Sequence, residues 1–546
     1  MSSSGPLPGD PACRGFLYPD AVLWASWVYS FANLATLALG TACLLAALAL
    51  VWRPALHSGA EAWFRRTART RGGRAGLWAA GLAVPAFAAL VKLAMYASFQ
   101  LTRDSANVVQ FAWNFAHGYG AVSTLSPPTH LAFHFSFTSL LLSPLLRLWD
   151  STAVFALVYG AAVGAVIPGV YLLARRRTKS PLHASLAALL AACHPLYLGM
   201  VGTIIEDSSL APAIFIWGVY FWECGQTPAA LAAAALLLTT KEQAPFVLAG
   251  FGLYLAARRE DRRLKTGLAL AAACVLCWFG EMAFIDSMRG GDWAPGSTSP
   301  WTLFPWLDVS HGPIAGLIHG PWRAAVNLVT PPVKLLTAAK LFFFAGGLPL
   351  VSGAPLLAVL VPWLPQQLAD WRLPFHQLGG SYAGFVLGPL LWAAVAGYCV
   401  ALERLAPRGR TLLAAGLLLV AGLGAVQSAG YYRPRLMPSS WRKAVPDAMA
   451  LIPPDAKVWC DGYLLPQLAL RRYVKKLPNA LPDPFFELEP FVPDRVLLSA
   501  YWLAVSDPAT VRRVLATMSA DGLVPVFREK DLVLYAPAPP AARAAR

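Results

Sequence analysis

Charged residues are scarce in this chain of 546 residues: Asp, Glu, Lys and Arg make up only 13%, whereas 57% are hydrophobic. An ordinary soluble domain carries about 25% charged residues. The apolar residues also fall in long runs, which excludes a disordered chain, a collagen-like fibre and a single soluble globule. The composition therefore predicts a polytopic helical membrane protein.

Motifs that build many soluble active sites are also missing. The sequence has no GxxxxGK[ST] phosphate loop, no GxGxxG that opens a βαβ unit, and no GxSxG nucleophile elbow. Most of the eight cysteines lie in apolar segments, and the one CxxC pair, Cys274 and Cys277, has no second pair or histidine nearby. These absences exclude a Walker-type NTPase and argue against a zinc site or a disulfide framework.

Positive charge is nevertheless in excess, with 44 Lys and Arg against 28 Asp and Glu, a formal net charge of +16. In a soluble protein this excess would suggest a nucleic-acid partner. Here the basic residues stand in short segments between apolar runs, where they set the orientation in the membrane. We therefore expect no nucleic-acid partner and place four basic segments in the cytoplasm: residues 53–74, 175–179, 258–265 and 404–410.

The apolar runs predict about 12 transmembrane spans. Residues 21–52 are too long a run for a signal-peptide core, so we expect a retained helix. Residues 131–149 are apolar enough to cross, but a crossing there would place Arg175–Arg177 outside, so we interpret them as re-entrant or interfacial. Residues 335–350 and 353–368 are expected to form a helical hairpin broken at glycines. The other predicted spans are 77–98, 152–174, 182–200, 209–223, 228–240, 245–257, 267–285, 382–402 and 411–429, and residues 286–332 are expected to form an external loop.

The predicted fold class is mainly α, a polytopic helical membrane protein with a small C-terminal extracytoplasmic α/β domain. Residues 1–76 would hold an extra N-terminal helix and a basic loop, residues 77–432 the transmembrane domain with an external loop at 99–151, and residues 433–546 the α/β domain. Its predicted strands are 457–460, 496–500, 524–528 and 532–535, and its predicted helices are 441–451 and 508–519. The tail from Pro537 is expected to be disordered.

The external segment 102–118 is the most informative one for chemistry. Read as a helix, it has an apolar face and a polar face with Asn107, Gln110, Asn114 and His117, which predicts a helix on the outer membrane surface. Asp104 stands at its start, directly after a span, where a carboxylate can act as a general base or hold a divalent cation. The alternative is that Asp104 merely caps the helix.

Further polar groups follow on the same predicted side of the membrane. His130 and His134 have the i, i+4 spacing of one helix face, which suits half of a metal site or a phosphate clamp, or two interfacial histidines bonded to the backbone. Glu206-Asp207 and Lys241-Glu242 stand in turns between spans. Gathered carboxylates can bind a cation and a lysine can pair with a phosphate, unless Lys241 and Glu242 neutralise one another or snorkel.

Four more residues are candidates for contact with an anionic or interfacial ligand. Lys92, Lys334 and Lys340 lie in or beside spans and suit an anionic head group, with snorkelling as the alternative reading. His376 stands in an external turn shortly before a predicted span, where histidines and aromatic residues such as Tyr382 are often membrane anchors.

The order of these motifs resembles a bacterial membrane-protein family known as domain of unknown function 2079. The resemblance rests on Asp104 with the Gln-Phe-Ala-Trp-Asn of residues 110–114, on His130 and His134, and on the later matches. The resemblance covers roughly residues 77–536. In order along the chain, the later matches are the end of the span at Arg175, His194-Pro195, Glu206-Asp207, Thr240-Lys241-Glu242, Pro349-Leu350, Pro362, His376 and the segment from Ile452 to Ala456.

That family is similar in layout to the GT-C superfamily of integral membrane glycosyltransferases. This resemblance implies a polyprenyl-phosphate-linked sugar donor and an acid in the first large external loop, which here is Asp104. It implies that Glu206, Asp207, Lys241 and Glu242 line the same cavity. Two departures stand out: Ile204-Ile205 replace the histidine that members often carry beside the acidic turn, and Asp104 is followed by Ser105 rather than by a second acid.

The leading hypothesis is therefore a GT-C-like hexosyl- or pentosyltransferase at the outer face of the bacterial inner membrane. Its expected partners are membrane lipids, a lipid-phosphate sugar donor and a glycan, lipid or protein acceptor. The predicted catalytic residues are Asp104, Glu206 and Asp207, and a divalent cation, Mg or Mn on Asp104 and Asp207, is an open alternative. A transporter or flippase for a lipid-linked or anionic solute and a non-catalytic scaffold are the rival functions. The predicted substrate-binding residues are Gln110, Asn114, His117, His130, His134, Lys241, Glu242 and His376.

Overall fold

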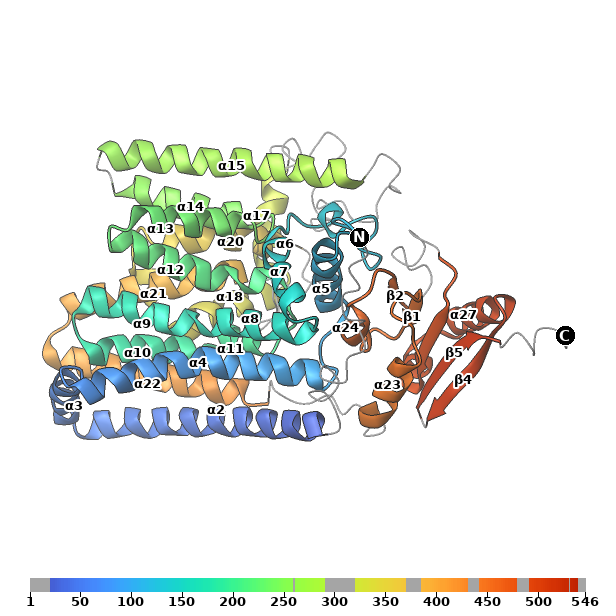
Figure 1. Ribbon diagram of the computed structural model, residues 1–546. Helices are drawn as coiled ribbons and strands as arrows, with labels where there is room; N and C mark the ends of the chain where they lie inside the picture. Colours follow the sequence, from blue (N-terminus) through green and yellow to red (C-terminus); the bar gives the residue numbers. More distant parts are fainter. Residues whose placement is uncertain are drawn as a thin grey trace.

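A long bundle of apolar helices and a small sheet domain at one end of it make up the protein, with helix α5 (Arg103–Ala116) between them (Figure 1). The computed structural model describes residues 20–258, 261–289, 320–369, 384–430, 441–478, 491–529 and 531–538. The expectations for most of the external loop 286–332, for His376 and Tyr382 and for most of the C-terminal tail lie outside these residues.

The mainly helical membrane fold is confirmed. Six helices or helix pairs are long and apolar enough to cross a membrane, and a seventh crossing follows if the bent pair α10 (Pro181–Ala192) and α11 (Pro195–Val201) counts as one. Every predicted span matches a described helix or helix pair, but several are short, so the count of about 12 stays a prediction. The six are α2 (Asp20–Trp52), α4 (Arg71–Ala97), α8 (Thr152–Gly164) with α9 (Val166–Thr178), α15 (Asp261–Arg289), α21 (Gly384–Arg404) and α22 (Pro407–Ser428).

Proline and glycine set the breaks between the shorter helices. The residue before a proline avoids helical dihedrals, and His194 before Pro195 is extended, so α10 and α11 meet at 62°. The His194 ring accepts the N–H of Leu196 at 3.1 Å and caps α11. The predicted hairpin is present and breaks where positive φ angles fall on glycine, at Gly346, Gly347 and Gly353. Its helices are α18 (Val333–Phe344), α19 (Leu348–Val351) and α20 (Leu356–Leu368).

Small residues bring several spans into contact backbone to backbone. A Cβ added to Gly160 of α8 would lie 2.5 Å from the Cα of Ala89 of α4, and one added to Gly164 would lie 2.4 Å from the Cα of Pro85. A Cβ on Gly397 of α21 would lie 1.9 Å from the carbonyl oxygen of Leu348. Such close approach gains van der Waals packing where lipid offers no hydrophobic driving force. The bundle is therefore held at fixed helix positions.

Residues 130–149 form short pieces, η1 (His130–Ala132), α6 (Thr138–Leu142) and α7 (Pro144–Leu148), and their re-entrant or interfacial placement stays a prediction. The helix predicted from Asp104 onward is present as α5, and its place at the outer membrane surface stays a prediction. Its apolar and polar faces are both buried, because the loop after it and the C-terminal domain cover the polar side.

The C-terminal domain has a five-stranded sheet in the order β2-β1-β3-β5-β4. Strand β1 pairs in parallel with β2 and β3, whereas β5 is antiparallel to β3 and β4. All the predicted strands and helices are present, and Asp507 caps its helix by accepting the N–H groups of Ala509 and Thr510. The elements are α23 (Trp441–Ala450), β1 (Val458–Cys460), α24 (Leu465–Leu468), β2 (Val474–Lys476), β3 (Arg495–Ser499), α26 (Ala500–Val505), α27 (Pro508–Ala520), β4 (Leu523–Glu529) and β5 (Leu532–Pro537).

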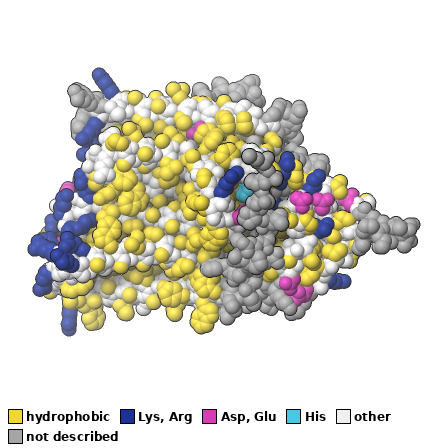
Figure 2. Space-filling view, in the orientation of Figure 1, with side chains coloured by type: hydrophobic (Ala, Val, Ile, Leu, Met, Phe, Trp, Pro, Cys, Tyr) yellow, Lys and Arg dark blue, Asp and Glu magenta, His cyan; other side chains and the backbone are white. Residues whose placement is uncertain are grey.

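Buried hydrogen bonds fasten this domain to the bundle. The Gln467 side chain donates to the carbonyl of Tyr96 at 2.8 Å, and Thr152 donates to the carbonyl of Pro466 at 2.8 Å. Lys and Arg side chains gather at the opposite end of the bundle, around α3 (Ala55–Thr67), with a broad hydrophobic band between (Figure 2). The two ends therefore differ in charge as the positive-inside rule expects for a cytoplasmic and an external side.

Candidate functional site

Four segments that are not part of any long span meet at the end of the bundle next to the C-terminal domain. They are the first turn of α5, the stretch from η1 to α6, the turn before η2 (Asp207–Ser209), and the turn between α13 (Thr227–Leu238) and α14 (Ala244–Ala257). Side chains from one segment bond the backbone of another, so that these irregular stretches are satisfied inside the protein.

Asp104 stands in the first turn of α5 and keeps an exposed carboxylate. It does not cap the helix, because the N-cap is Thr102 and no hydrogen bond to Asp104 is found among the described residues. Burial of its surroundings, followed by the charge of Glu206, raises its pKa, against a lowering by Arg103, Lys241 and His134. The side chain is thus accessible, yet protein surrounds it closely enough to disfavour its charged form.

Glu206 and Lys241 form an ion pair in which the lysine side chain is 2% and the glutamate side chain 12% accessible. The pair joins the turn before η2 to the turn between α13 and α14. Lys92 of α4 supports the first turn by donating to the carbonyls of Thr203 and Ile204. Ser105 of α5 accepts the N–H of Ile205 at 2.8 Å, so the start of α5 and this turn are tied together.

Asp207 is buried, and each of its carboxylate oxygens accepts a hydroxyl, one from Ser136 and one from Tyr159. Burial raises its pKa, while these two hydrogen bonds lower it. Asp207 is therefore a positioning residue, because its two hydrogen bonds hold the stretch between η1 and α6 against α8. A direct catalytic or metal-binding role for Asp207 stays a prediction.

Glu242 bonds His134, whereas Lys241 forms its ion pair with Glu206, and mutual neutralisation within Lys241-Glu242 stays a prediction. The His134 Nδ1 lies 3.1 Å from one Glu242 oxygen, and the N–H of Phe135 donates to the other at 3.2 Å. Burial would raise the pKa of Glu242, but His134, by its charge and its hydrogen bond, and Lys241 lower it to about 2. Glu242 is therefore ionised at neutral pH.

His130 faces α5 instead of the acids. Its Nδ1 lies 2.9 Å from the amide nitrogen of Asn107, and its ring centroid lies 5.4 Å from that of His134. Burial, then the charges of His134 and Lys241, lower its pKa well below the usual value. His130 is therefore neutral at pH 7, and the two histidines come together as their spacing suggests, each held by a side chain rather than by the backbone.

Gln110 and Asn114 serve the fold of this region. Gln110 is fully buried, donates to Thr124 and to the carbonyls of Arg471 and Arg472, and accepts from Ser123 and two backbone N–H groups. Asn114 donates to the carbonyl of Val122 at 3.0 Å. His117 is exposed at the end of α5, where it stacks on Trp113 with centroids 4.2 Å apart. Substrate contact by these three residues stays a prediction.

Lys334 is buried and donates to the carbonyls of Asn327 and Gln367, so it closes a helix junction. Among the described residues, no group of three or more His, Cys, Asp or Glu side chains could hold a metal ion. Because both oxygens of Asp207 are also taken, the residues present do not fit a cation held by Asp104 and Asp207.

Some residues that shape the site were not singled out in the sequence. Ser105, Ser136 and Tyr159 hold the acids in place, and their types and positions carry no signal for such a role. Glu281 of α15 is also buried, and its carboxylate is bonded by the Cys277 thiol at 3.4 Å, while its other oxygen has no hydrogen-bond partner in the part of the chain that the structure describes. The sequence did carry a signal for Glu281, because a single acid inside an apolar run is unusual.

Residues 102–513 match a family described as "Predicted membrane protein (DUF2079)", which covers well over half of the chain. The chain belongs to this family. The match to DUF2079 contains Asp104, Glu206, Lys241 and Glu242, whereas α2, α3 and α4 precede it.

No curated protein matches this DUF2079 chain. Among solved structures, it is similar to that of ArnT from Cupriavidus metallidurans in the apo state, at 14% identity and with a TM-score of 0.43. That similarity covers 85% of this chain and 98% of the other. Identity this low gives no correspondence between individual residues.

Proposed function

We propose that this DUF2079 protein is a GT-C-like membrane glycosyltransferase that takes its sugar from a polyprenyl-phosphate donor. The observation that supports it best is the exposed carboxylate of Asp104 beside a buried ion pair, Glu206–Lys241, at one end of the bundle. An accessible base and a shielded cation are what a sugar transfer from a phosphate requires. The basic residues at the opposite end of the bundle support a location of the site at the outer face of the inner membrane.

The reaction breaks the bond between the anomeric carbon of the sugar and a phosphate oxygen, and forms a bond from that carbon to an acceptor oxygen. Asp104 takes the proton that the acceptor hydroxyl loses. The protein around Asp104 raises its pKa, so this carboxylate is a stronger base than an aspartate with the ordinary pKa. The bond electrons leave with the phosphate, which departs as a lipid phosphate.

Lys241 receives that departing phosphate. Its ammonium is nearly inaccessible in the ion pair with Glu206, so its charge acts in a region that excludes most water. The phosphate of the donor competes with Glu206 for this ammonium and gains negative charge as the sugar leaves, which strengthens the interaction in the transition state. His134 and Glu242 hold the adjoining segments in position. No step of this mechanism passes through a metal ion.

A transporter or flippase needs charged groups along a path that opens to both sides, whereas these groups cluster at one end of the bundle. Labelling of single cysteines introduced at residues 104 and 206 separates the two functions. Reaction with an impermeant maleimide from the outer side only is expected for the transferase, and reaction from both sides would favour the transporter. A scaffold function predicts that alanine at both acids leaves every phenotype unchanged.

The decisive experiment is Asp104→Asn in purified protein reconstituted in nanodiscs. The assay presents polyprenyl-phosphate hexoses and pentoses with a membrane glycan and lipid extract, and mass spectrometry measures the released polyprenyl phosphate. Loss of a general base is expected to lower the rate about 100-fold or more. Asp455→Asn, which alters an exposed acid of the C-terminal domain, is the matched control and should retain the full rate. Wild-type turnover in a folded Asp104→Asn protein would falsify the assignment.

A further inference from the structure

Glu281 is the one charged residue of α15 between Lys265 and Asp286. It faces the bundle and is 3% exposed, whereas most of α15 lies open on the outside of the bundle. Gly267 and Cys274 lie on the same buried stripe, at steps of seven residues. An ionisable group buried inside a span points to a function by default, and the proposed transfer reaction does not use Glu281.

The turn before α14 stands at the level of Glu281. Helices α14 and α15 run antiparallel in close contact (Figure 1), and the rings of Phe246 and Trp278 lie 5.4 Å apart between them. Gln243 precedes Phe246 by three residues and Glu281 follows Trp278 by three, so the antiparallel register brings Gln243 and Glu281 to one level. Glu242 is also near enough for its charge to act on Glu281.

Two buried acceptor atoms at this level, Oε2 of Glu281 and Oε1 of Gln243, find no hydrogen-bond donor among the described residues. The other end of each side chain is bonded. The Cys277 thiol donates to Oε1 of Glu281 at 3.4 Å, and Nε2 of Gln243 donates to Glu242 at 3.0 Å. Because the Glu242 carboxylate can only accept, the Gln243 amide cannot turn around without losing that bond. Buried acceptors without a donor are costly and rare.

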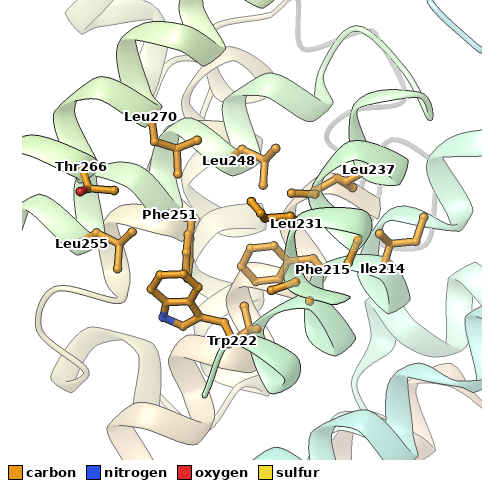
Figure 3. A pocket seen from close by; sticks show the side chains of 15 residues that line it. Ile214, Phe215, Trp222, Leu231, Leu237, Leu248, Phe251, Leu255, Thr266 and Leu270 are labelled. Atoms are coloured by element: carbon orange, nitrogen blue, oxygen red, sulfur yellow. The ribbon is translucent and has the colours of Figure 1, made fainter. Parts of the chain in front are cut away.

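The side of α14 and α15 away from this turn is apolar. The two helices help to line a pocket of about 210 Å³ with Leu248, Phe251 and Leu270 (Figure 3). The one hydroxyl of the lining belongs to Thr266, about 22 Å of helix rise from Glu281. This side therefore supplies no donor. An ionised Glu281 would be a buried charge in an apolar setting, which costs far more than the neutral acid.

We infer that Glu281 binds a proton at neutral pH and donates it in a hydrogen bond to Oε1 of Gln243. One proton then satisfies both acceptor atoms. The bonds run in one direction: the Cys277 thiol donates to Glu281, Glu281 to Gln243, and Gln243 to Glu242, which also holds His134. Glu281 is a positioning residue that acts through Gln243. The inference goes beyond the proposed function and does not depend on it.

This chain of bonds ends next to Asp104. Glu242 holds His134 at 3.1 Å, and the charge of His134 acts on Asp104. Loss of the proton from Glu281 at alkaline pH would leave Gln243 without its donor and would give Glu242 a second negative neighbour. The orientation of His134 is therefore tied to a protonation site within the span.

Other groups around Glu281 also titrate or carry charge, so the test has to separate them from it. Besides α15 itself, the elements in contact with this part of α15 are α14 with the turn before it and the stretch from η1 to α6. The groups on these elements are Cys274, Cys277, Asp286 and Arg289 of α15, Lys241 and Glu242 of the turn, and His130 and His134 of the stretch.

The first test compares the pH dependence of unfolding, measured by SDS titration of the full-length protein, in the wild type and in Glu281→Gln. Both proteins carry Cys277→Ser, which removes the nearest thiol and keeps a donor. A folded state that retains this proton above about pH 4.3, where a free glutamate titrates, loses up to about tenfold in its folding constant per pH unit relative to the variant. Glu281→Gln offers an amide N–H to Gln243 at every pH, so its profile should lack this decline.

The second test reads the proton directly by infrared spectroscopy at pH 7, on protein with carbon-13 in its glutamate carboxyl groups. The wild type should show the carbonyl band of a protonated glutamate, and Glu281→Gln should lose it. In Gln243→Leu the band should remain but shift, because the hydrogen bond is gone. Glu403→Gln, which changes an exposed acid, is the matched control and should leave the band unchanged.

Parallel unfolding profiles of the wild type and Glu281→Gln, or no protonated glutamate at pH 7, would overturn the inference. A sodium ion between the two oxygens is tested by replacing Na⁺ with choline, and a loss of stability there, without the infrared band, would also overturn it. If Glu281→Gln does not fold, the band of the wild type and its shift in Gln243→Leu still decide. No readout requires sugar transfer, so failure of the proposed function leaves this result standing.

Discussion

Removing either partner of the Glu206–Lys241 pair should destabilise the protein strongly. Lys241→Met leaves the Glu206 carboxylate, 12% accessible, without its ammonium, and Glu206→Gln leaves the ammonium, 2% accessible, without its carboxylate. Breaking a buried pair from one side costs about 3–5 kcal/mol, because an uncompensated charge stays in a poorly solvated place. The double variant Glu206→Gln/Lys241→Met should recover a large part of this loss, since no lone charge remains.

The double-mutant cycle is measured as apparent free energies of unfolding in detergent micelles, from denaturant titrations at pH 7.5 and at two salt concentrations. We expect a coupling energy of a few kcal/mol with little salt dependence, because a buried pair is poorly screened. The exposed pair Glu61–Arg65 is the control, and its coupling should stay below about 1 kcal/mol. A coupling for Glu206–Lys241 no larger than that of the control would refute the burial argument and with it the shielded cation on which the transfer mechanism depends.

Two further predictions concern pH and packing. The pKa of Glu242 is about 2 in the folded protein, below its unfolded value, so its contribution to stability is complete above pH ~4.5 and is lost as the pH falls toward 2. The free energy of unfolding should therefore fall more steeply from pH 6 to pH 3 for the wild type than for Glu242→Gln, by about 2 kcal/mol, and parallel curves would contradict the pairing with His134. Gly397→Ala should destabilise the bundle by about 1–3 kcal/mol or prevent insertion, because its Cβ has no room beside the Leu348 carbonyl. Gly416→Ala, where nothing lies within 4 Å of the added Cβ, should leave the thermal midpoint unchanged or raise it slightly, and equal losses in both variants would refute the close contact.

The spans could be predicted because their signals are local. Apolar runs mark the helices, and Pro195, Gly347 and Gly353 stand where the backbone must leave the helical region. In the C-terminal domain, β2 and α24 were missed because three or four residues carry too little periodicity to be recognised.

The residues of the site could be predicted from the sequence better than the contacts between them. Asp104, Glu206, Lys241 and Glu242 stand out because charges are rare beside spans. Which charges pair depends on contacts distant in sequence, such as the ion pair of Lys241 with Glu206, 35 residues away. The polar face of α5 is buried because Gln110 bonds the carbonyls of Arg471 and Arg472, which are more than 360 residues away. The periodicity of one helix cannot reveal that a distant domain packs on it.

The glycine contacts between α4 and α8 also limit how this protein can move. With Gly160 and Gly164 seated on the backbone of α4, a rocking motion that separates these helices would lose van der Waals contacts that lipid cannot replace with equal density. Large rigid-body rearrangement of the spans is therefore costly. For the proposed transfer, we expect the spans to stay in place while the lipid carrier diffuses within the bilayer and the irregular segments at the end of the bundle adjust.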